Sequence, residues 1–135
     1  MNTNKQLVQD YMQSVWVEQK IDQVGNFIAD DLIQHNPNLL DGRKALEDFL
    51  PVLFNDLMPN LKWQVARVIA EDDLVVVHSL ATTPAMPNGM AVVEIFRVES
   101  GKIVEHWDAI QSMDGFMRFY ALLTGGTIRN ANGVF

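Results

Sequence analysis

The sequence contains no cysteine, only five prolines and no long apolar run. Without cysteine the chain has neither a disulfide framework nor a thiol nucleophile. No apolar run approaches the roughly 20 residues that a membrane-spanning helix needs. The N-terminus also lacks a basic segment followed by an apolar stretch, which is the pattern of a secretory signal. We therefore expect a cytoplasmic protein that has no membrane partner.

Positive charge is scarce as well. The chain has 10 Lys and Arg residues against 17 Asp and Glu residues, and its net charge is −7. This balance disfavours nucleic acid and anionic lipid surfaces as partners. The three histidines show no metal-ligand spacing, and no glycine-rich dinucleotide fingerprint is present. We therefore expect neither a metal nor another cofactor.

The apolar residues that are present change their spacing along the chain. Helical spacing occurs over residues 4–20, over residues 22–30 and in a third segment that opens at Asp41-Gly42. Pro51 lies inside that third segment and is expected to kink it or split it near Leu50. From Leu61 onward the spacing changes to two, which indicates strands. Helices that come before strands predict an α+β fold, and a length of 135 residues fits a single domain over residues 1–135. A further short helix is expected after Asp114.

The segment 90–111 indicates a β-hairpin. β-Branched and aromatic residues fill both arms, and Ser100-Gly101 supplies the residues of a tight two-residue loop. A regular hairpin around that loop would place Glu94 opposite Trp107. Partners across a hairpin share a face of the sheet, so the register decides which titratable side chains point inward.

The regular register divides the hairpin into two faces. One face carries Val92, Glu94, Phe96, Glu105, Trp107, Ala109 and Gln111. The other carries Val93, Ile95, Arg97, Val104, His106, Asp108 and Ile110. Both faces are largely apolar, and a carboxylate among apolar neighbours is costly unless it is paired, hydrogen-bonded or protonated. The question for function is which face lines a cavity.

The hairpin string from Glu94 to Asp108, EIFRVESGKIVEHWD, resembles the closing hairpin of the SnoaL-like polyketide cyclases. Two further strings, QHNP at residues 34–37 and VVH at residues 76–78, resemble a SnoaL-like branch labelled ester cyclase or predicted aldol-condensation enzyme. The resemblance covers nearly the whole chain. It implies the nuclear-transport-factor-2-like, cystatin-like fold, in which a cone-shaped, curved, mostly antiparallel sheet wraps around N-terminal helices.

The resemblance also implies where acid/base chemistry would lie. In these cyclases the catalytic acid/base is an Asp four residues after the hairpin Trp, a position that Gln111 occupies here and cannot fill because it does not titrate. We therefore expect Glu94 to be the catalytic carboxylate, paired with His78 on the neighbouring strand, with Asp108 as a secondary candidate. The alternative for His78 is an ordinary histidine of the core.

Six further residues are expected to contact a small apolar ligand: Tyr11, Trp16, His35, Asn36, Trp107 and Gln111. Tyr11 and Trp16 lie on the apolar side of the first helix, where the alternative is plain core packing. His35 and Asn36 precede a proline, which keeps the segment extended or turned. Their alternatives are the mouth of the cavity or hydrogen bonds that hold the loop.

Two classes of function follow. The first is a small cofactor-independent acid/base enzyme of the isomerase, cyclase or lyase type, acting on an apolar carbonyl compound. The second is a non-catalytic module that binds a small molecule. We also expect a homodimer, because Val93, Ile95, Val104 and Ile110 would make the outer face of the sheet too apolar to leave in water.

Overall fold

The computed structural model of the chain describes residues 2–113, 123 and 125. Its helical elements are α1 (Thr3–Tyr11), η1 (Met12–Val17), η2 (Ile21–Gln23), α2 (Val24–Phe27), α3 (Arg43–Val52) and η3 (Leu53–Leu57). Its strands are β1 (Ile28–Gln34), β2 (Lys62–Glu71), β3 (Leu74–Thr83), β4 (Met86–Glu99) and β5 (Lys102–Ser112). Among these residues, no helix is long and apolar enough to cross a membrane. The helix predicted after Asp114 lies outside the described residues.

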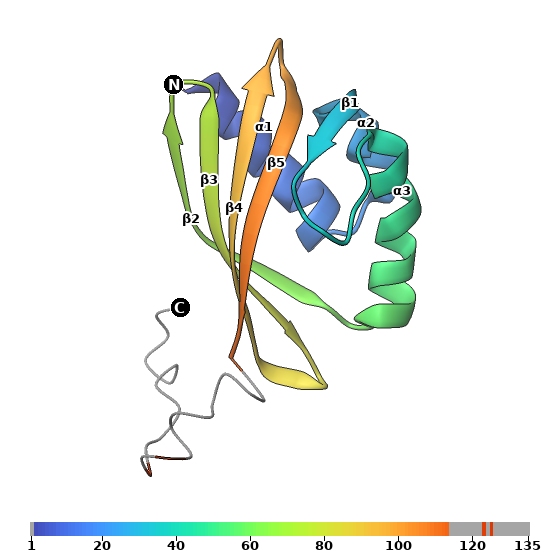
Figure 1. Cartoon of the computed structure of the whole chain (residues 1–135), viewed down its shortest axis with the longest axis vertical. Coiled ribbons are helices and arrows are strands. Elements are labelled where there is room, and N and C mark those ends of the chain that lie inside the picture. Colours follow the sequence, from blue (N-terminus) through green and yellow to red (C-terminus); the bar gives the residue numbers. More distant parts are fainter. Residues whose placement is uncertain (1, 114–122, 124, 126–135) are drawn as a thin grey trace.

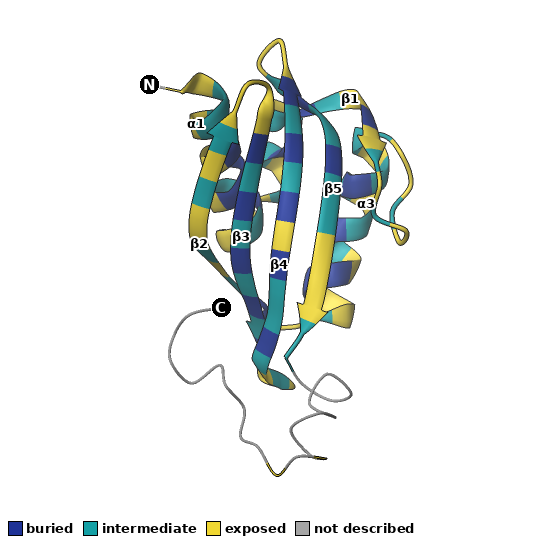
Figure 2. Cartoon of the chain, turned by 60° about the vertical axis from the view of Figure 1, so that its left-hand side comes forward, coloured by how far each residue is buried: buried dark blue, intermediate teal, exposed yellow. Residues whose placement is uncertain are grey.

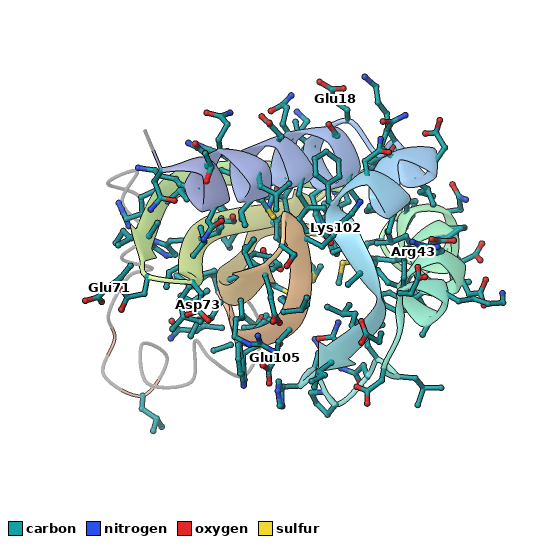
Figure 3. The ribbon with its side chains drawn as sticks, turned by 90° about the horizontal axis from the view of Figure 1, so that it is seen from above. Glu18, Arg43, Glu71, Asp73, Lys102 and Glu105 are labelled. Carbon is teal, nitrogen blue, oxygen red and sulfur yellow. The ribbon has the colours of Figure 1, made fainter. Side chains whose placement is uncertain are left out.

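The five strands form one mixed sheet in the order β1-β5-β4-β3-β2. β1 runs parallel to β5, whereas the other neighbouring pairs are antiparallel. Figure 1 shows α1 crossing one face of the sheet, with α3 next to β1. Seen from above in Figure 3, the sheet curves beneath α1 without closing into a barrel. This arrangement confirms the predicted α+β fold.

The core lies between the helices and the inner face of the curved sheet. The helices contribute Val8, Met12, Val15, Val24, Leu46 and Leu50. The sheet contributes Val75, Val77, Val92, Phe96, Val98 and Ile103. Buried and less buried residues alternate along β3 and β4 (Figure 2), as expected when helices cover one face only. Each fully buried large apolar side chain stabilises the fold by roughly 1.5–3 kcal/mol relative to exposure.

Strands cover two stretches in which the sequence predicted none. The second helix was predicted over residues 22–30 but ends at Phe27, because Ile28 pairs with Ile103 of β5 and is 1% exposed. β4 was predicted to begin at Met90 but begins at Met86. Gly89 makes this extension possible, because its φ is 75° and a Cβ atom there would lie 2.4 Å from the carbonyl oxygen of Ala81.

Pro51 does not break the third helix. α3 continues through Pro51 to Val52 and then widens into the π-helical η3, where the amide of Met58 donates to the carbonyl oxygen of Leu53 at 2.8 Å. The wider π-helical turn follows the proline directly. Leu53 and Phe54 therefore remain buried beyond the proline.

The hairpin turn is confirmed. Ser100 and Gly101 have φ angles of 51° and 75°, and Glu99 pairs with Lys102 across the two-residue loop. Two successive positive φ angles are what a tight hairpin turn needs to match the twist of its strands. The Lys102 ammonium donates to the carbonyl oxygens of Gly25 and Asn26, both at 2.9 Å, and so ties the turn to α2.

The register beyond the turn differs from the prediction because β5 contains a β-bulge. Val98 pairs with Ile103 and Arg97 pairs with Glu105, so Val104 is an extra residue without a partner in β4. A bulge of this kind shifts every later residue by one position. The predicted register was therefore wrong.

The shift exchanges the two faces of the second arm. Glu94 lies opposite Asp108 instead of Trp107, and Phe96 lies opposite His106. His106 and Asp108 therefore share the inner face with Glu94. Trp107 shares the outer face with Ile95.

On the outer face beside the bulge, the Glu105 carboxylate contacts two other side chains. Its Oε2 accepts a hydrogen bond from Arg97 Nε at 2.7 Å, and its Oε1 lies 2.9 Å from His35 Nε2. The contact with His35, followed by that with Arg97, holds the pKa of the Glu105 carboxyl below its usual value. Figure 3 shows Glu105 on the side of the sheet away from α1. The ionised carboxylate thus links β5 with β4 and with the end of β1.

Replacing Glu105 by Gln should destabilise the protein at neutral pH, because an amide oxygen binds Arg97 and His35 less strongly than a carboxylate does. The folded-state pKa of Glu105 lies below the usual value of 4.5, so this stabilisation is present above 4.5 and is lost as the pH falls through the folded-state pKa. The difference in Tm between wild type and Glu105→Gln, measured by circular dichroism, should therefore shrink in acid. Glu71→Gln, at the exposed end of β2, is the control, and a Tm difference for Glu105→Gln that is independent of pH would contradict this account.

Candidate functional site

A cavity of about 340 Å³ lies between the inner face of the sheet and the helices. Most of its wall is apolar and includes Leu32, Leu46, Phe49, Leu53, Val92 and Phe96. Among the described residues, six polar or charged ones also line it, namely Gln34, Asn36, Asn38, Glu94, His106 and Asp108. The volume falls within the range of about 300–1,000 Å³ that is typical of small-molecule pockets.

Aromatic side chains form a second part of the wall. Trp16 and Trp63 pack with ring centroids 4.7 Å apart, and Phe54 meets Trp16 edge-on at 5.8 Å. The indole N–H of Trp16 donates to the Tyr11 hydroxyl oxygen at 3.0 Å. Both Tyr11 and Trp16 line the cavity, and Tyr11 is at the same time part of the buried core.

The Tyr11 hydroxyl stays protonated. Burial raises its pKa well above the ordinary value, the hydrogen bond from Trp16 acts in the opposite direction, and the charge of Glu94 raises it further. The hydroxyl oxygen already accepts a hydrogen bond from Trp16. Its proton therefore serves as a neutral hydrogen-bond donor beside the cavity.

The inner face of the hairpin joins Glu94 to His106. Nε2 of His106 lies 3.2 Å from Oε1 of Glu94, and the two residues are 8% and 3% exposed. On the other side of the ring, Nδ1 lies 2.6 Å from Oε1 of Gln34. An amide oxygen only accepts hydrogen bonds, so Nδ1 carries a proton and one further proton can lie between Nε2 and Glu94.

The second oxygen of Glu94 has no hydrogen-bond partner within residues 2–113. This Oε2 atom is buried, although Glu94 lines the cavity. Leaving a buried carboxyl oxygen without a hydrogen-bond partner costs about 1–3 kcal/mol of stability. Such a cost, in a wall that is mostly apolar, is expected where a group is kept for chemistry or for a ligand.

Asp108 completes a cluster on the inner face. Its Oδ2 accepts a hydrogen bond from the Asn36 amide at 2.7 Å, and Asn36 Oδ1 accepts one from the backbone N–H of Asn38 at 2.8 Å. One ligand atom from each of Glu94, His106 and Asp108 lies within 4.8 Å of the others. The sequence showed no metal-ligand spacing, yet the fold brings together three groups that can exchange protons or share a cation.

Three residues predicted to contact a ligand lie outside the cavity. The ring of His35 stacks on Trp107, with centroids 4.7 Å apart and an interplanar angle of 3°. Both rings lie on the outer face, next to Glu105. Gln111 is exposed. The bulge explains the positions of Trp107 and Gln111, because both belong to the alternate residues that it turns outward.

His78 does not pair with Glu94. In the sheet His78 lies opposite Val93, whose side chain is 40% exposed on the outer face. The His78 ring contacts Arg67 of β2 through Nδ1. The predicted Glu94–His78 pair is therefore replaced by the pair of Glu94 with His106.

The cavity holds five of the residues that the sequence singled out, namely Tyr11, Trp16, Asn36, Glu94 and Asp108. Sequence reasoning missed His106 because it assumed a regular hairpin. It also missed Gln34, although strand alternation offered a signal. Gln34 and Asn36 are two apart and point to the same side, whereas His35 between them points to the other.

Solved structures share this fold at low sequence identity. A candidate polyketide cyclase from Acidithiobacillus ferrooxidans is 17% identical with a TM-score of 0.69, over 93% of this chain and 97% of that chain. An LEH-like epoxide hydrolase from M. tuberculosis is 17% identical with a TM-score of 0.69, over 92% and 97%. A candidate ketosteroid isomerase from Kribbella flavida is 14% identical with a TM-score of 0.71, over 84% and 80%.

The sequence itself identifies the family. No curated protein sequence matches the chain. The family model of the SnoaL-like domain matches residues 8–106, which run from α1 to the histidine of the candidate site and make up more than half of the chain. This match confirms the resemblance to SnoaL-like proteins that the hairpin indicated. The chain therefore belongs to the family of SnoaL-like domains.

Proposed function

We propose that this protein is a cofactor-independent acid/base enzyme that acts on a small apolar carbonyl compound. The observation that carries the proposal is the buried Glu94–His106 pair, in which one Glu94 oxygen is left unpartnered within the described residues beside an apolar cavity. A carboxylate paired with an imidazole is suited to moving a proton to or from carbon next to a carbonyl group. Glu94 retains the catalytic role proposed from the sequence, with His106 as its partner.

In the proposed reaction, Oε2 of Glu94 removes a proton from the carbon beside the substrate carbonyl. The electrons of the broken C–H bond move into the carbonyl group and give an enolate. The neutral Tyr11 hydroxyl donates a hydrogen bond to the enolate oxygen, where negative charge develops. Return of the proton to the same carbon exchanges hydrogen, and its return to another carbon isomerises the substrate. Asp108 is a second group that can receive or return the proton.

The comparisons support this class of chemistry. Two relatives carry names that refer to ketone-containing compounds, a polyketide and a ketosteroid. Because those likenesses establish only a shared fold, the reaction and the substrate class belong to the proposal. The apolar wall supports a substrate with a hydrophobic body and a single polar group, since most of the lining offers no hydrogen bonds.

The second candidate is a non-catalytic module that binds a small apolar molecule. The hydrogen bonds from His106 to Gln34 and from Asn36 to Asp108 favour it, because they partly satisfy the cluster without a substrate. In that case Glu94 and His106 form a structural pair and the cavity only encloses its ligand.

Exchange of carbon-bound hydrogen separates the two candidates. We expect the wild-type protein in D₂O to speed deuterium incorporation beside the carbonyl group of a bicyclic ketone such as 2-tetralone, followed by proton NMR. Glu94→Gln keeps the shape and removes the base, so it should slow exchange by about 10²–10⁴-fold. Binding of the ketone, followed by quenching of Trp16 and Trp63 fluorescence, should persist in the variant.

The matched control is Glu99→Gln, which changes an exposed residue of the same strand and should leave exchange unchanged. If wild type binds a panel of cyclic ketones but exchanges none of them, the binding module is the better account. If Glu94→Gln exchanges as fast as wild type, Glu94 is not the base.

We also propose that two copies pair through the outer face of the sheet. Cross-strand pairing aligns Ile69, Val76, Ile95 and Trp107 in one row across four strands. Ile69 is 60% exposed, and Val93 in the next row is 40% exposed. Of the residues first assigned to this surface, Ile110 instead lines the cavity because of the bulge. An apolar row of this extent is typical of a protein interface.

Sedimentation at micromolar concentration tests the dimer. The wild-type chain should sediment as a dimer and Ile69→Glu as a monomer, because the new charge would be buried without a partner between two copies. Leu40→Glu is the control, since Leu40 is 80% exposed and lies outside the sheet. A monomeric wild type, or a dimer that survives Ile69→Glu, would refute this interface.

A further inference from the structure

Three consecutive side chains at the end of β1 contact side chains of β5. Gln34 contacts His106 at 2.6 Å, His35 contacts Glu105 at 2.9 Å, and Asn36 donates to Asp108 at 2.7 Å. The contacts of Gln34 and Asn36 lie on the cavity side, whereas that of His35 lies outside. The segment 34–36 therefore contacts both carboxylates of β5 and its histidine.

Gln34 is itself fixed in orientation. Its Oε1 accepts a hydrogen bond from the backbone N–H of Asn36 at 3.4 Å, and its own backbone N–H donates to Asp41 Oδ1 at 2.8 Å. A backbone N–H only donates, so the atom of the Gln34 amide that faces Asn36 and His106 is the oxygen. The ring nitrogen that meets this oxygen must carry a proton.

We propose that Gln34 is a positioning residue that keeps the proton on Nδ1 of His106 and turns Nε2 toward Glu94. A single proton then lies between Nε2 and Glu94 Oε1, while Glu94 Oε2 stays free to accept another. The tautomer is a property of the folded chain, and only its kinetic consequence rests on the proposed function. Without the Gln34 oxygen, a buried Nδ1–H would have no acceptor, and the ring would favour the neutral tautomer that has its proton on Nε2.

Nitrogen-15 NMR of histidine-labelled protein tests the proposal directly, because the chain contains only three histidines. The His106 signals are assigned by their loss in His106→Gln. We expect the wild-type protein to carry a proton on His106 Nδ1. Gln34→Leu should remove that proton from Nδ1, and Gln34→Glu, which keeps an acceptor oxygen, should retain it. Gln64→Leu changes an exposed glutamine of β2 and should leave the spectrum unchanged.

The kinetic consequence is measured on the same variants by deuterium exchange into 2-tetralone. Gln34→Leu should slow exchange on the order of 10-fold with unchanged ketone binding, and Gln34→Glu should restore it in part. Loss of binding together with exchange would instead indicate a merely structural role and would overturn the positioning role.

The outcomes separate this inference from the proposed function. A wild-type His106 with no proton on Nδ1 overturns the inference, whatever the folding of the variants. A Gln34→Leu spectrum identical to that of wild type overturns it as well. If the tautomer is as expected but Glu94→Gln still exchanges at the wild-type rate, the acid/base function fails and the tautomer assignment stands.

Discussion

The β-bulge at Val104 is the constraint on which the rest of the site depends. It inserts one extra residue in β5 between the pairs Val98–Ile103 and Arg97–Glu105. Side chains alternate along a strand, so this single residue decides whether His106 and Asp108 or Trp107 and Gln111 face the helices. The bulge thereby turns an ordinary hairpin into one that carries a titratable cluster on its inner face.

Three sets of contacts around the bulge stabilise this register. Lys102 binds the end of α2, Ile103 is fully buried against Ile28, and Glu105 binds Arg97 and His35 on the outside. β1 is irregular at the same place, because it advances five residues from Ile28 to Ile33 while β5 advances two from Ile103 to Glu105. The site therefore lies where two irregular strands, β1 and β5, run parallel. Polar side chains at the end of β1 supply hydrogen-bond partners to part of the buried cluster. Within the described residues, this arrangement leaves Oε2 of Glu94 buried without a hydrogen-bond partner.

Local signals predicted the fold well. The change of spacing near Leu61 and the Ser100-Gly101 turn are short-range patterns, and the structure confirms the fold class and the turn. The bulge has no comparable signal, because it depends on long-range pairing with β1, and that pairing also ended the second helix at Phe27. For the same reason Glu94 was placed correctly on the inner face while its histidine partner was not. Gln34 was within reach of the sequence, but its role depends on a contact that only the fold creates.

Cross-strand disulfide formation tests the register most directly, because the chain has no cysteine of its own. In the bulged register Val93 lies opposite Ala109, and both are exposed on the outer face. Oxidised Val93→Cys/Ala109→Cys protein should therefore lose both free thiols in a thiol titration, since directly opposite residues have Cβ atoms only about 4.5–5.5 Å apart. Val93→Cys/Asp108→Cys should keep both thiols, because the two side chains point to opposite faces. A disulfide in the second variant and none in the first would show a regular hairpin and contradict the account of the site.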